Sequence, residues 1–212
     1  DFDDAENFIQ NINDNYLIVS FAPIWKLADY LNRIFLNKPH QLKGLKGILA
    51  CSSSSIYTKK FAANKFDKYL YLRLYKSERI LSRLTEEYNA PLCILEPTMI
   101  YGNIERYKDK NVNLLSFYLN NFPFIFIPSN TGKRQPIHAS QLAKLAIKKI
   151  EYFINFGDIK FEKVPIGGDE IITFEELLFR INKVNLNKKV KILKCYIFRI
   201  PNRIFYLLLS PL

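Results

Sequence analysis

The sequence predicts an α/β fold with a parallel sheet that helices cover on both faces. Three apolar, β-rich runs alternate with segments whose apolar residues recur at helical spacing. Helical segments of this kind connect parallel strands, because such strands need a crossover that returns the chain to the same end of the sheet. No internal repeat or low-complexity linker interrupts the pattern.

The expected elements follow one another in a regular order. The first strand is predicted at 16–23, YLIVSFAP, and a helix at 25–36, WKLADYLNRIFL, where apolar residues have helical spacing. Glycine breaks precede the second strand, GLKGILACSSSS at 44–55. A long helix is predicted over about 67–89, and the third strand is PLCILEP at 91–97.

Length and composition indicate a globular protein. The 212 residues are 49% hydrophobic, enough to bury the core of one large domain or one and a half. The net charge of +11 comes from 31 Lys and Arg residues spread along the whole chain, and the clusters TKK, NKK and IKKI are short and far apart. Nucleic-acid binding is therefore not expected, although a basic surface favours an anionic ligand.

Cysteine and histidine are too sparse for a metal site. The three cysteines, Cys51, Cys93 and Cys195, are widely spaced, and the two histidines are His40 and His138. This spacing matches neither a zinc site nor a disulfide framework. We expect buried thiols, a cytoplasmic location and no bound metal.

The tail at 197–212, IFRIPNRIFYLLLSPL, comes closest to a membrane-spanning segment. A spanning helix needs roughly 20 apolar residues, and Arg199, Pro201 and Arg203 interrupt the tail. We therefore predict an amphipathic docking helix and no membrane span. The abrupt ends of the chain suggest a fragment of a longer protein.

Hydroxyl groups gather where two of the three strands end. Ligands of parallel α/β sheets bind outside the carboxyl ends of the strands, where polar side chains can face a cleft. The three ends read FAP, SSSSIY and EPTMIYG. A single serine run is also typical of a flexible turn, so the hydroxyls alone do not define a site.

Four segments in order resemble the landmarks of one family. They are ILACSSSSIY, KSERILSRLTEEYNAPLCILEPTMIYG, RQPIHASQLAKLAI and VPIGGDEIITFEELL. Together they resemble the NAD(P)-dependent epimerase/dehydratase family, the extended short-chain dehydrogenases, over nearly the whole chain. The resemblance implies a Rossmann-like sheet, with 1–102 as the latter part of the dinucleotide-binding domain. It implies that 103–212 is mainly substrate-binding, with 134–170 returning to the Rossmann sheet.

The start of the chain resembles the middle of that domain. DFDD resembles the family's acidic segment after its third strand, which implies that Asp1 meets the adenine amino group and Phe2 lines the adenine pocket. The glycine-rich first turn, whose backbone amides hold the pyrophosphate, has no counterpart, because the first glycine is Gly44. Either the sequence lacks its N-terminal part or it cannot hold NAD in the family's manner, and we favour the missing part.

Catalysis in this family uses a tyrosine base, a lysine that lowers its pKa, and a serine or threonine hydroxyl that hydrogen-bonds the reacting oxygen. Counting back from the isoleucine of SSSSIY places that hydroxyl at Ser53, with Ser54 as the alternative and as a substrate-binding residue.

The tyrosine and lysine are absent from their expected positions. The family's helix reads Y-x-x-x-K-x-x-x-E, and the spacing from Glu78 to Glu96 matches that from its acid to the arginine of its L-R-P segment. This register puts Leu70 and Leu74 at the tyrosine and lysine positions. Glu96 itself replaces the arginine.

Tyr69 and Arg73 form the nearest tyrosine–cation pair with i, i+4 spacing, one residue early. We predict them as the catalytic pair on the condition that a one-residue bulge separates them from Glu78. A shift of one residue turns a side chain by about 100° around a helix. The alternative is that Tyr69, Tyr71 and Tyr75 are packing residues of an aromatic helix.

The other landmarks follow the family more closely. The resemblance implies that Ala22, Pro97 and Thr98 contact the cofactor. It also implies that Tyr101 opens the substrate region and that Arg134 of RQPIHA clamps a phosphate of a nucleotide-sugar, for which a planar guanidinium is well suited. His138 is expected to cap or pack the helix that follows.

These features predict an NAD(P)-dependent nucleotide-sugar epimerase or dehydratase that works by transient hydride transfer, with NAD or NADP left open. The alternative is a catalytically inactive dinucleotide-binding protein with an assembly or sensing role. The resemblance also allows a homodimer. Whether the protein is an enzyme depends on the displaced tyrosine.

Overall fold

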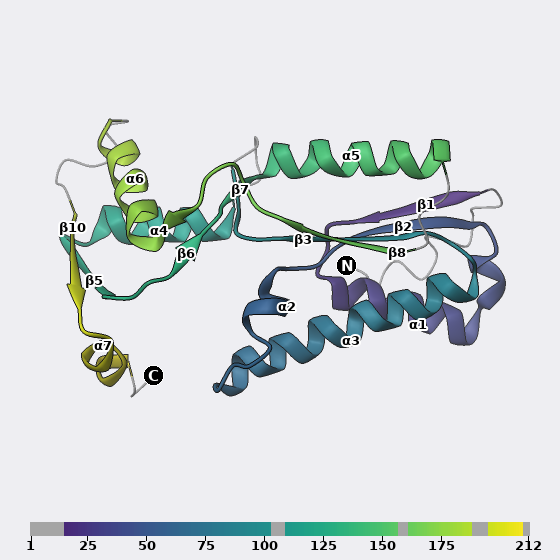
Figure 1. Ribbon diagram of the computed structural model, residues 1–212, viewed down its shortest axis with the longest axis horizontal. Helices are drawn as coiled ribbons and strands as arrows, with labels where there is room; N and C mark the ends of the chain where they lie inside the picture. Colours follow the sequence, from purple (N-terminus) through teal and green to yellow (C-terminus); the bar gives the residue numbers. More distant parts are fainter. Residues whose placement is uncertain (1–14, 103–108, 157–160, 188–194, 210–212) are drawn as a thin grey trace. The chain divides into compact units, whose positions relative to one another are not determined.

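The computed structural model describes residues 15–102, 109–156, 161–187 and 195–209 (Figure 1). The described residues form two compact units. Unit 1 lies within Asp1–Thr98 and Gln141–Ile166, and unit 2 within Met99–Ser140 and Gly167–Leu212.

Unit 1 contains a four-stranded sheet in which every pairing is parallel. The strand order is β1-β2-β3-β8. The strands are β1 (Tyr16–Ser20), β2 (Leu45–Cys51), β3 (Leu92–Pro97) and β8 (Phe161–Ile166). β2 and β3 are buried along most of their length, as expected for a parallel sheet with helices on both faces. The predicted α/β class with a Rossmann-like parallel sheet is confirmed.

Helices cover both faces of this sheet. The helices α1 (Ile24–Asn37) and α3 (Lys65–Glu87) lie on one face and α5 (Ala139–Phe156) on the other (Figure 1). The short helices η2 (Pro39–Leu42) and α2 (Ser55–Thr58) follow α1 and β2. α3 begins where the Asn64 side chain accepts a hydrogen bond from the backbone N–H of Asp67, which satisfies one of the free amides of the first turn.

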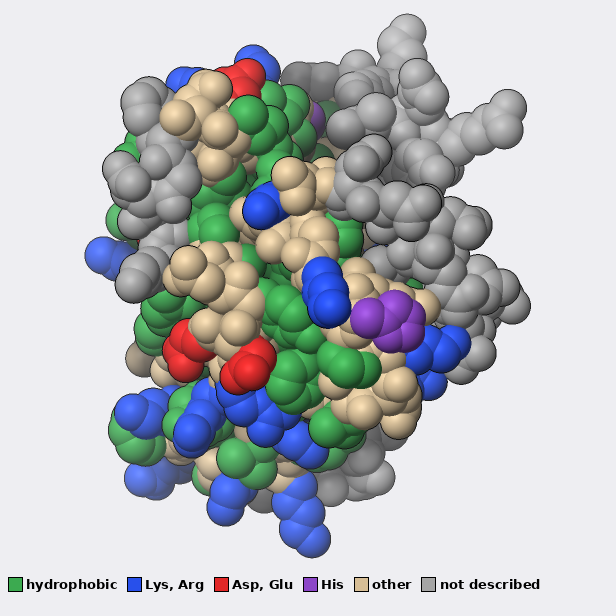
Figure 2. All heavy atoms as spheres, turned by 90° about the vertical axis from the view of Figure 1, so that its right-hand side faces the viewer, with side chains coloured by type: hydrophobic (Ala, Val, Ile, Leu, Met, Phe, Trp, Pro, Cys, Tyr) green, Lys and Arg blue, Asp and Glu red, His purple; other side chains and the backbone are tan. Residues whose placement is uncertain are grey.

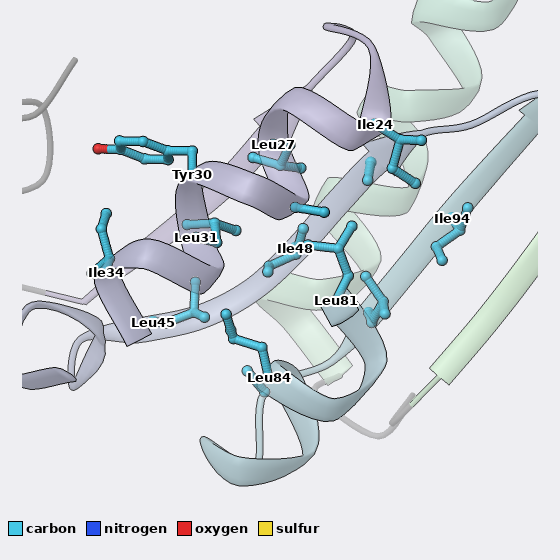
Figure 3. Packing of buried hydrophobic residues seen from close by; sticks show 14 of the residues in the cluster. Ile24, Leu27, Tyr30, Leu31, Ile34, Leu45, Ile48, Leu81, Leu84 and Ile94 are labelled. Atoms are coloured by element: carbon cyan, nitrogen blue, oxygen red, sulfur yellow. The ribbon is translucent and has the colours of Figure 1, made fainter. Parts of the chain in front are cut away.

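The core of unit 1 lies between the sheet and the pair α1 and α3. The helix α1 presents one apolar stripe because Ile24, Leu27 and Leu31 recur at helical spacing, and all three are buried. They pack toward Ile48 of β2 and Leu81 of α3 (Figure 3). The same stripe is the reason why the sequence pattern alone predicted this helix.

The surface of unit 1 is basic, as the composition implies. Figure 2 shows Lys and Arg side chains gathered along the lower part of one face, with few Asp or Glu side chains among them. The three cysteines are buried free thiols, as expected. Within the described residues, no group of His, Cys, Asp and Glu could hold a metal ion, and no helix is long and apolar enough to cross a membrane.

The described residues of unit 2 form three small sheets and three helices. The strand pairs are β4 (Ile100–Tyr101) with β7 (Ile137–His138), β5 (Phe124–Pro128) with β10 (Tyr196–Ile200), and β6 (Lys133–Arg134) with β9 (Ile172–Thr173). The helices are α4 (Lys110–Asn121), α6 (Phe174–Asn187) and α7 (Asn202–Leu209). Leu119, Ile127, Leu178 and Cys195 are at the centre of its core.

Candidate functional site at the carboxyl ends of the unit 1 strands

The loops after β2 and β3 are tied to the neighbouring strands by backbone hydrogen bonds. The N–H of Ser52 donates to the carbonyl of Leu95 at 2.7 Å, and that of Ser54 donates to Pro97 at 3.0 Å. The N–H of Thr98 donates to Ile166 at 2.9 Å. The serine run is therefore held against the carboxyl end of β3 and is not a loose turn, while Thr98 is held against the end of β8.

Ser53, the predicted catalytic hydroxyl, lies in this loop and is half-buried. Its Oγ donates to the Oγ of Ser55 at 3.1 Å and accepts from the N–H of Ser55 at 3.2 Å. These two contacts hold the hydroxyl against Ser55, the first residue of the short helix α2. Ala22 follows β1 and is half-buried, and Pro97 is buried at the end of β3.

A buried carboxylate links three elements behind this loop. The side chain of Glu78 on α3 is 2% exposed. Its Oε1 accepts from the hydroxyl of Ser52 at 2.5 Å, and its Oε2 accepts from the Nζ of Lys163 at 2.6 Å. Because a buried charge needs a partner, the ion pair with Lys163 of β8 stabilises the carboxylate of Glu78.

Glu96 occupies position 96 itself and is fully buried. Its Oε2 accepts from the phenol of Tyr57 at 2.5 Å, while its Oε1 has no hydrogen-bond partner among the described residues. Burial is the main cause that raises the pKa of Glu96, and the nearby carboxylate of Glu78 raises it further. The hydrogen bond from Tyr57 and the charge of Lys163 lower the pKa of Glu96 and offset part of this rise.

Tyr57 is not suited to act as a base. Its hydrogen bond to Glu96, followed by desolvation, raises the pKa of its phenol to about 12. A catalytic tyrosine requires the opposite shift, because it must lose its proton near neutral pH. Tyr57 therefore covers Glu96 and keeps its proton.

Tyr69 and Arg73, the predicted catalytic pair, lie on the outer side of α3. Lys65–Glu87 form one uninterrupted helix, so the bulge that this assignment requires is not there. At about 100° per residue, Tyr69 is turned about 180° from Glu78. Tyr69 is 60% exposed, and the guanidinium carbon of Arg73 lies 4.3 Å from the ring centroid of Trp25. Their catalytic role stays a prediction, and the geometry favours a packing role.

The leucines at the family's tyrosine and lysine positions belong to the core. Leu74 is 2% exposed within the main hydrophobic cluster, and Leu70 packs against that cluster. Neither can exchange a proton. Positions 70 and 74 of α3 therefore carry no titratable side chain.

Arg134, the predicted phosphate clamp, is in β6 of unit 2 and is exposed. Its Nη1 donates to the carbonyl of Lys133 at 3.0 Å, and its guanidinium carbon lies 5.7 Å from the ring centroid of Phe174. The guanidinium thus lies near an aromatic ring on the exposed surface, and an exposed guanidinium can bind an oxyanion.

Tyr101 and His138, also in unit 2, form an edge-to-face aromatic pair with ring centroids 5.2 Å apart. The Nδ1 of His138 accepts from the N–H of Ser140 at 3.2 Å at the start of α5, so His138 caps this helix as expected. Gly102 has φ +125, and a Cβ there would lie 2.6 Å from the Nε2 of His138. Only glycine fits beside the histidine.

Asp1 and Phe2, predicted to contact adenine, lie outside the described residues. The sequence reasoning missed Ser52, Tyr57 and Lys163. A signal for them was present in Glu78, since a buried acid in a helix requires a donor, but no local pattern identifies a lysine 85 residues away as that donor.

Comparisons with known proteins agree with this geometry at the level of the fold. No family model matches the sequence. The UDP-glucuronic acid 4-epimerase of Bacillus cereus is 17% identical with a TM-score of 0.55, and the match covers 83% of this chain and 54% of that one. The dTDP-glucose 4,6-dehydratase of Bacillus anthracis is 14% identical with a TM-score of 0.61, covering 94% and 65%. The chain has the fold of the nucleotide-sugar epimerases and dehydratases.

One curated protein is similar in sequence to part of this chain. The chain is 29% identical over 103 residues to NADH dehydrogenase (ubiquinone) 1 alpha subcomplex subunit 9, mitochondrial, of Dictyostelium discoideum. The match covers 49% of this chain and 27% of that protein. The chain thus spans about a quarter of the curated relative's length and between half and two thirds of the two solved structures' lengths.

Proposed function

We propose that the complete protein binds NAD or NADP and serves as an assembly or sensing component that does not use the tyrosine–lysine chemistry of its fold. The observation that carries this proposal is the orientation of α3. The side of that helix that contains Glu78 carries Leu70 and Leu74, while Tyr69 lies on the opposite side.

Dinucleotide binding is supported by the edge of the unit 1 sheet. A Rossmann-type sheet binds its cofactor across the carboxyl ends of the strands. Here those ends carry Ser53 as a half-buried hydroxyl and Ala22 as a small, half-buried residue. These residues fit the nicotinamide half of a dinucleotide. The pyrophosphate half needs a glycine-rich turn, which the 212 residues do not contain.

The comparisons support the same proposal. The two solved neighbours are described as complexes with NAD, and the curated relative is named as a subunit of an NADH dehydrogenase. A subunit role requires no base in the site, which agrees with the two leucines on α3. A cytoplasmic location and a homodimer stay predictions.

The test uses the complete protein. NAD, NADH, NADP and NADPH are titrated by calorimetry, and UDP-glucuronic acid and dTDP-glucose turnover is measured on the same samples. We expect saturable dinucleotide binding and no turnover of either sugar. Absence of binding would overturn the dinucleotide proposal, and turnover that Tyr69→Phe abolishes would overturn the non-catalytic role.

A nucleotide-sugar epimerase or dehydratase is the second candidate. The exposed, ring-supported guanidinium of Arg134 favours it, because this group is suited to a nucleotide phosphate. In this case Tyr69→Phe lowers turnover by about 10²- to 10⁴-fold, as expected for the loss of a general base. Tyr71→Phe and Tyr75→Phe are the matched controls on the same helix and leave turnover unchanged.

A further inference from the structure

The outer side of α3 carries a continuous row of exposed residues, most of which are cations. Residues three or four positions apart lie on the same side of a helix. Six exposed residues have this spacing: Lys68, Leu72, Tyr75, Lys76, Arg79 and Arg83. We call these six residues the α3 stripe. It extends about 22 Å along the helix at 1.5 Å per residue.

The opposite side of α3 is packed in the core of unit 1. Leu74, Leu81 and Leu84 are buried there, each at most 2% exposed. Helical periodicity turns the α3 stripe about 180° away from these leucines. The core therefore uses one side of α3 and leaves the stripe at the surface.

The cations of the α3 stripe have no acidic partner. Within the described residues, none of the four makes an ion pair, although ion pairs hold cations on other elements: Lys59 with Asp67, Lys149 with Glu162, Arg180 with Glu170 and Glu176, and Arg199 with Glu175. Glu86, the next residue on the same side of α3, accepts a hydrogen bond from Ser82 and ends the row of cations. The stripe therefore has an excess of positive charge.

Apolar groups lie between these cations. Leu72 is 50% exposed and Tyr75 is 43% exposed. The guanidinium carbon of Arg79 lies 5.9 Å from the ring centroid of Tyr75, so charge and apolar surface are adjacent. A phosphate backbone would match the cations but would leave Leu72 without an apolar partner. A helix with acids beside leucines matches both.

We propose that the α3 stripe docks an acidic, amphipathic segment of a partner protein. The proposal gives the assembly role proposed above a partner of stated chemistry, and in that sense it rests on that role. Acids of the partner would pair with Lys76 and Arg79, while its apolar side would cover Leu72. A second copy of this chain fits less well, because pairing two such stripes brings like charges together.

Fluorescence anisotropy with the full chain tests this proposal. The first probe is a labelled helical peptide of about 20 residues, a length that matches the stripe, with Glu and Leu at helical spacing in an Ala background. The second peptide has Gln in place of every Glu, and the third probe is a single-stranded DNA of similar length. We expect the Glu peptide to bind with an affinity that falls as salt is added, because salt screens exposed charges. The Gln peptide should bind at least about tenfold more weakly.

Charge reversal of the stripe gives the decisive comparison. Lys76→Glu with Arg79→Glu should lower the affinity for the Glu peptide by about tenfold or more, because two attractions become repulsions. The matched control is Lys144→Glu with Lys148→Glu on α5, which covers the other face of the sheet (Figure 1). It changes the net charge equally and should bind like the parent chain.

The apolar part of the stripe is tested separately. Leu72→Ser should lower the affinity for the Glu peptide by about threefold, because a half-exposed leucine no longer leaves water on binding. If the charge-reversal variant does not fold, as judged by thermal melting, Arg79→Gln alone should still lower the affinity by about threefold.

The proposal is overturned if the Glu and Gln peptides bind equally, if the α5 control loses binding to the same extent, or if the DNA binds more tightly than the Glu peptide. Dinucleotide titration of the complete protein keeps the two proposals apart. Charge reversal of the stripe should leave dinucleotide affinity unchanged, since the stripe is turned away from the sheet. Peptide binding without dinucleotide binding would overturn the dinucleotide proposal alone.

Discussion

Replacing Glu96 by glutamine should remove a pH dependence from the stability of unit 1. Glu96 is fully buried, accepts a hydrogen bond from Tyr57, and faces the Glu78–Lys163 pair. Burial is the first cause that raises its pKa in the folded protein. A glutamine at this position would keep the shape of the side chain and an oxygen for the Tyr57 phenol, but it would carry no titratable proton.

The sign follows from proton binding. A raised pKa means that the folded protein keeps the proton at pH values where the unfolded chain has released it. The stability that Glu96 contributes is therefore complete below the ordinary glutamate pKa and is lost as pH rises through the raised one. In that window one proton changes the free energy of unfolding by at most about 1.4 kcal/mol per pH unit.

Urea unfolding of the parent chain and of Glu96→Gln, measured from pH 5 to pH 8, gives the two free energies of unfolding. We expect the variant to gain stability relative to the parent as pH rises, because only the parent has to bury a charge. Glu87→Gln, which changes an exposed acid at the end of α3, is the control and should leave the slope unchanged. Parallel pH profiles of the parent and Glu96→Gln would show that Glu96 is ionised in the folded state and would refute this reasoning.

Three further predictions concern the same structure. Lys163→Met should lower the free energy of unfolding by about 2 kcal/mol, as measured by urea unfolding. This loss is smaller than the loss from breaking a fully buried ion pair, because the lysine side chain is 35% exposed. Adding Glu78→Gln should recover part of the lost stability. Leu74→Ala should cost about 2–5 kcal/mol through the cavity that it leaves in the core, whereas Leu72→Ala at a half-exposed position should cost much less in the same assay. If the second candidate function holds, Arg134→Ala in the complete protein should weaken nucleotide-sugar binding by about tenfold or more in calorimetry without lowering the melting temperature, and Arg134→Lys should recover only part of the affinity. A lower melting temperature with unchanged affinity would instead assign Arg134 to support of unit 2.

The sequence by itself determined the α/β class and the order of its elements. Ile24, Leu27 and Leu31 recur at the helical period, and β2 and β3 are continuous apolar runs, so local patterns were sufficient for both. The serine run after β2 could also be placed at a carboxyl end, because a parallel sheet brings such ends to one edge. These inferences depend on neighbours in the chain, which the sequence displays directly.

Only the tertiary structure decided which side of α3 faces the sheet. Helical periodicity gives the angle between Tyr69 and Glu78, but it does not say which of the two faces the sheet. Glu78 faces the sheet, because it contacts Ser52 in the loop after β2 and Lys163 of β8. A buried charge needs a partner, and here the partner comes from a distant part of the chain. The packing of α3 on the sheet brings the two residues together, and a local sequence pattern cannot reveal such a pair.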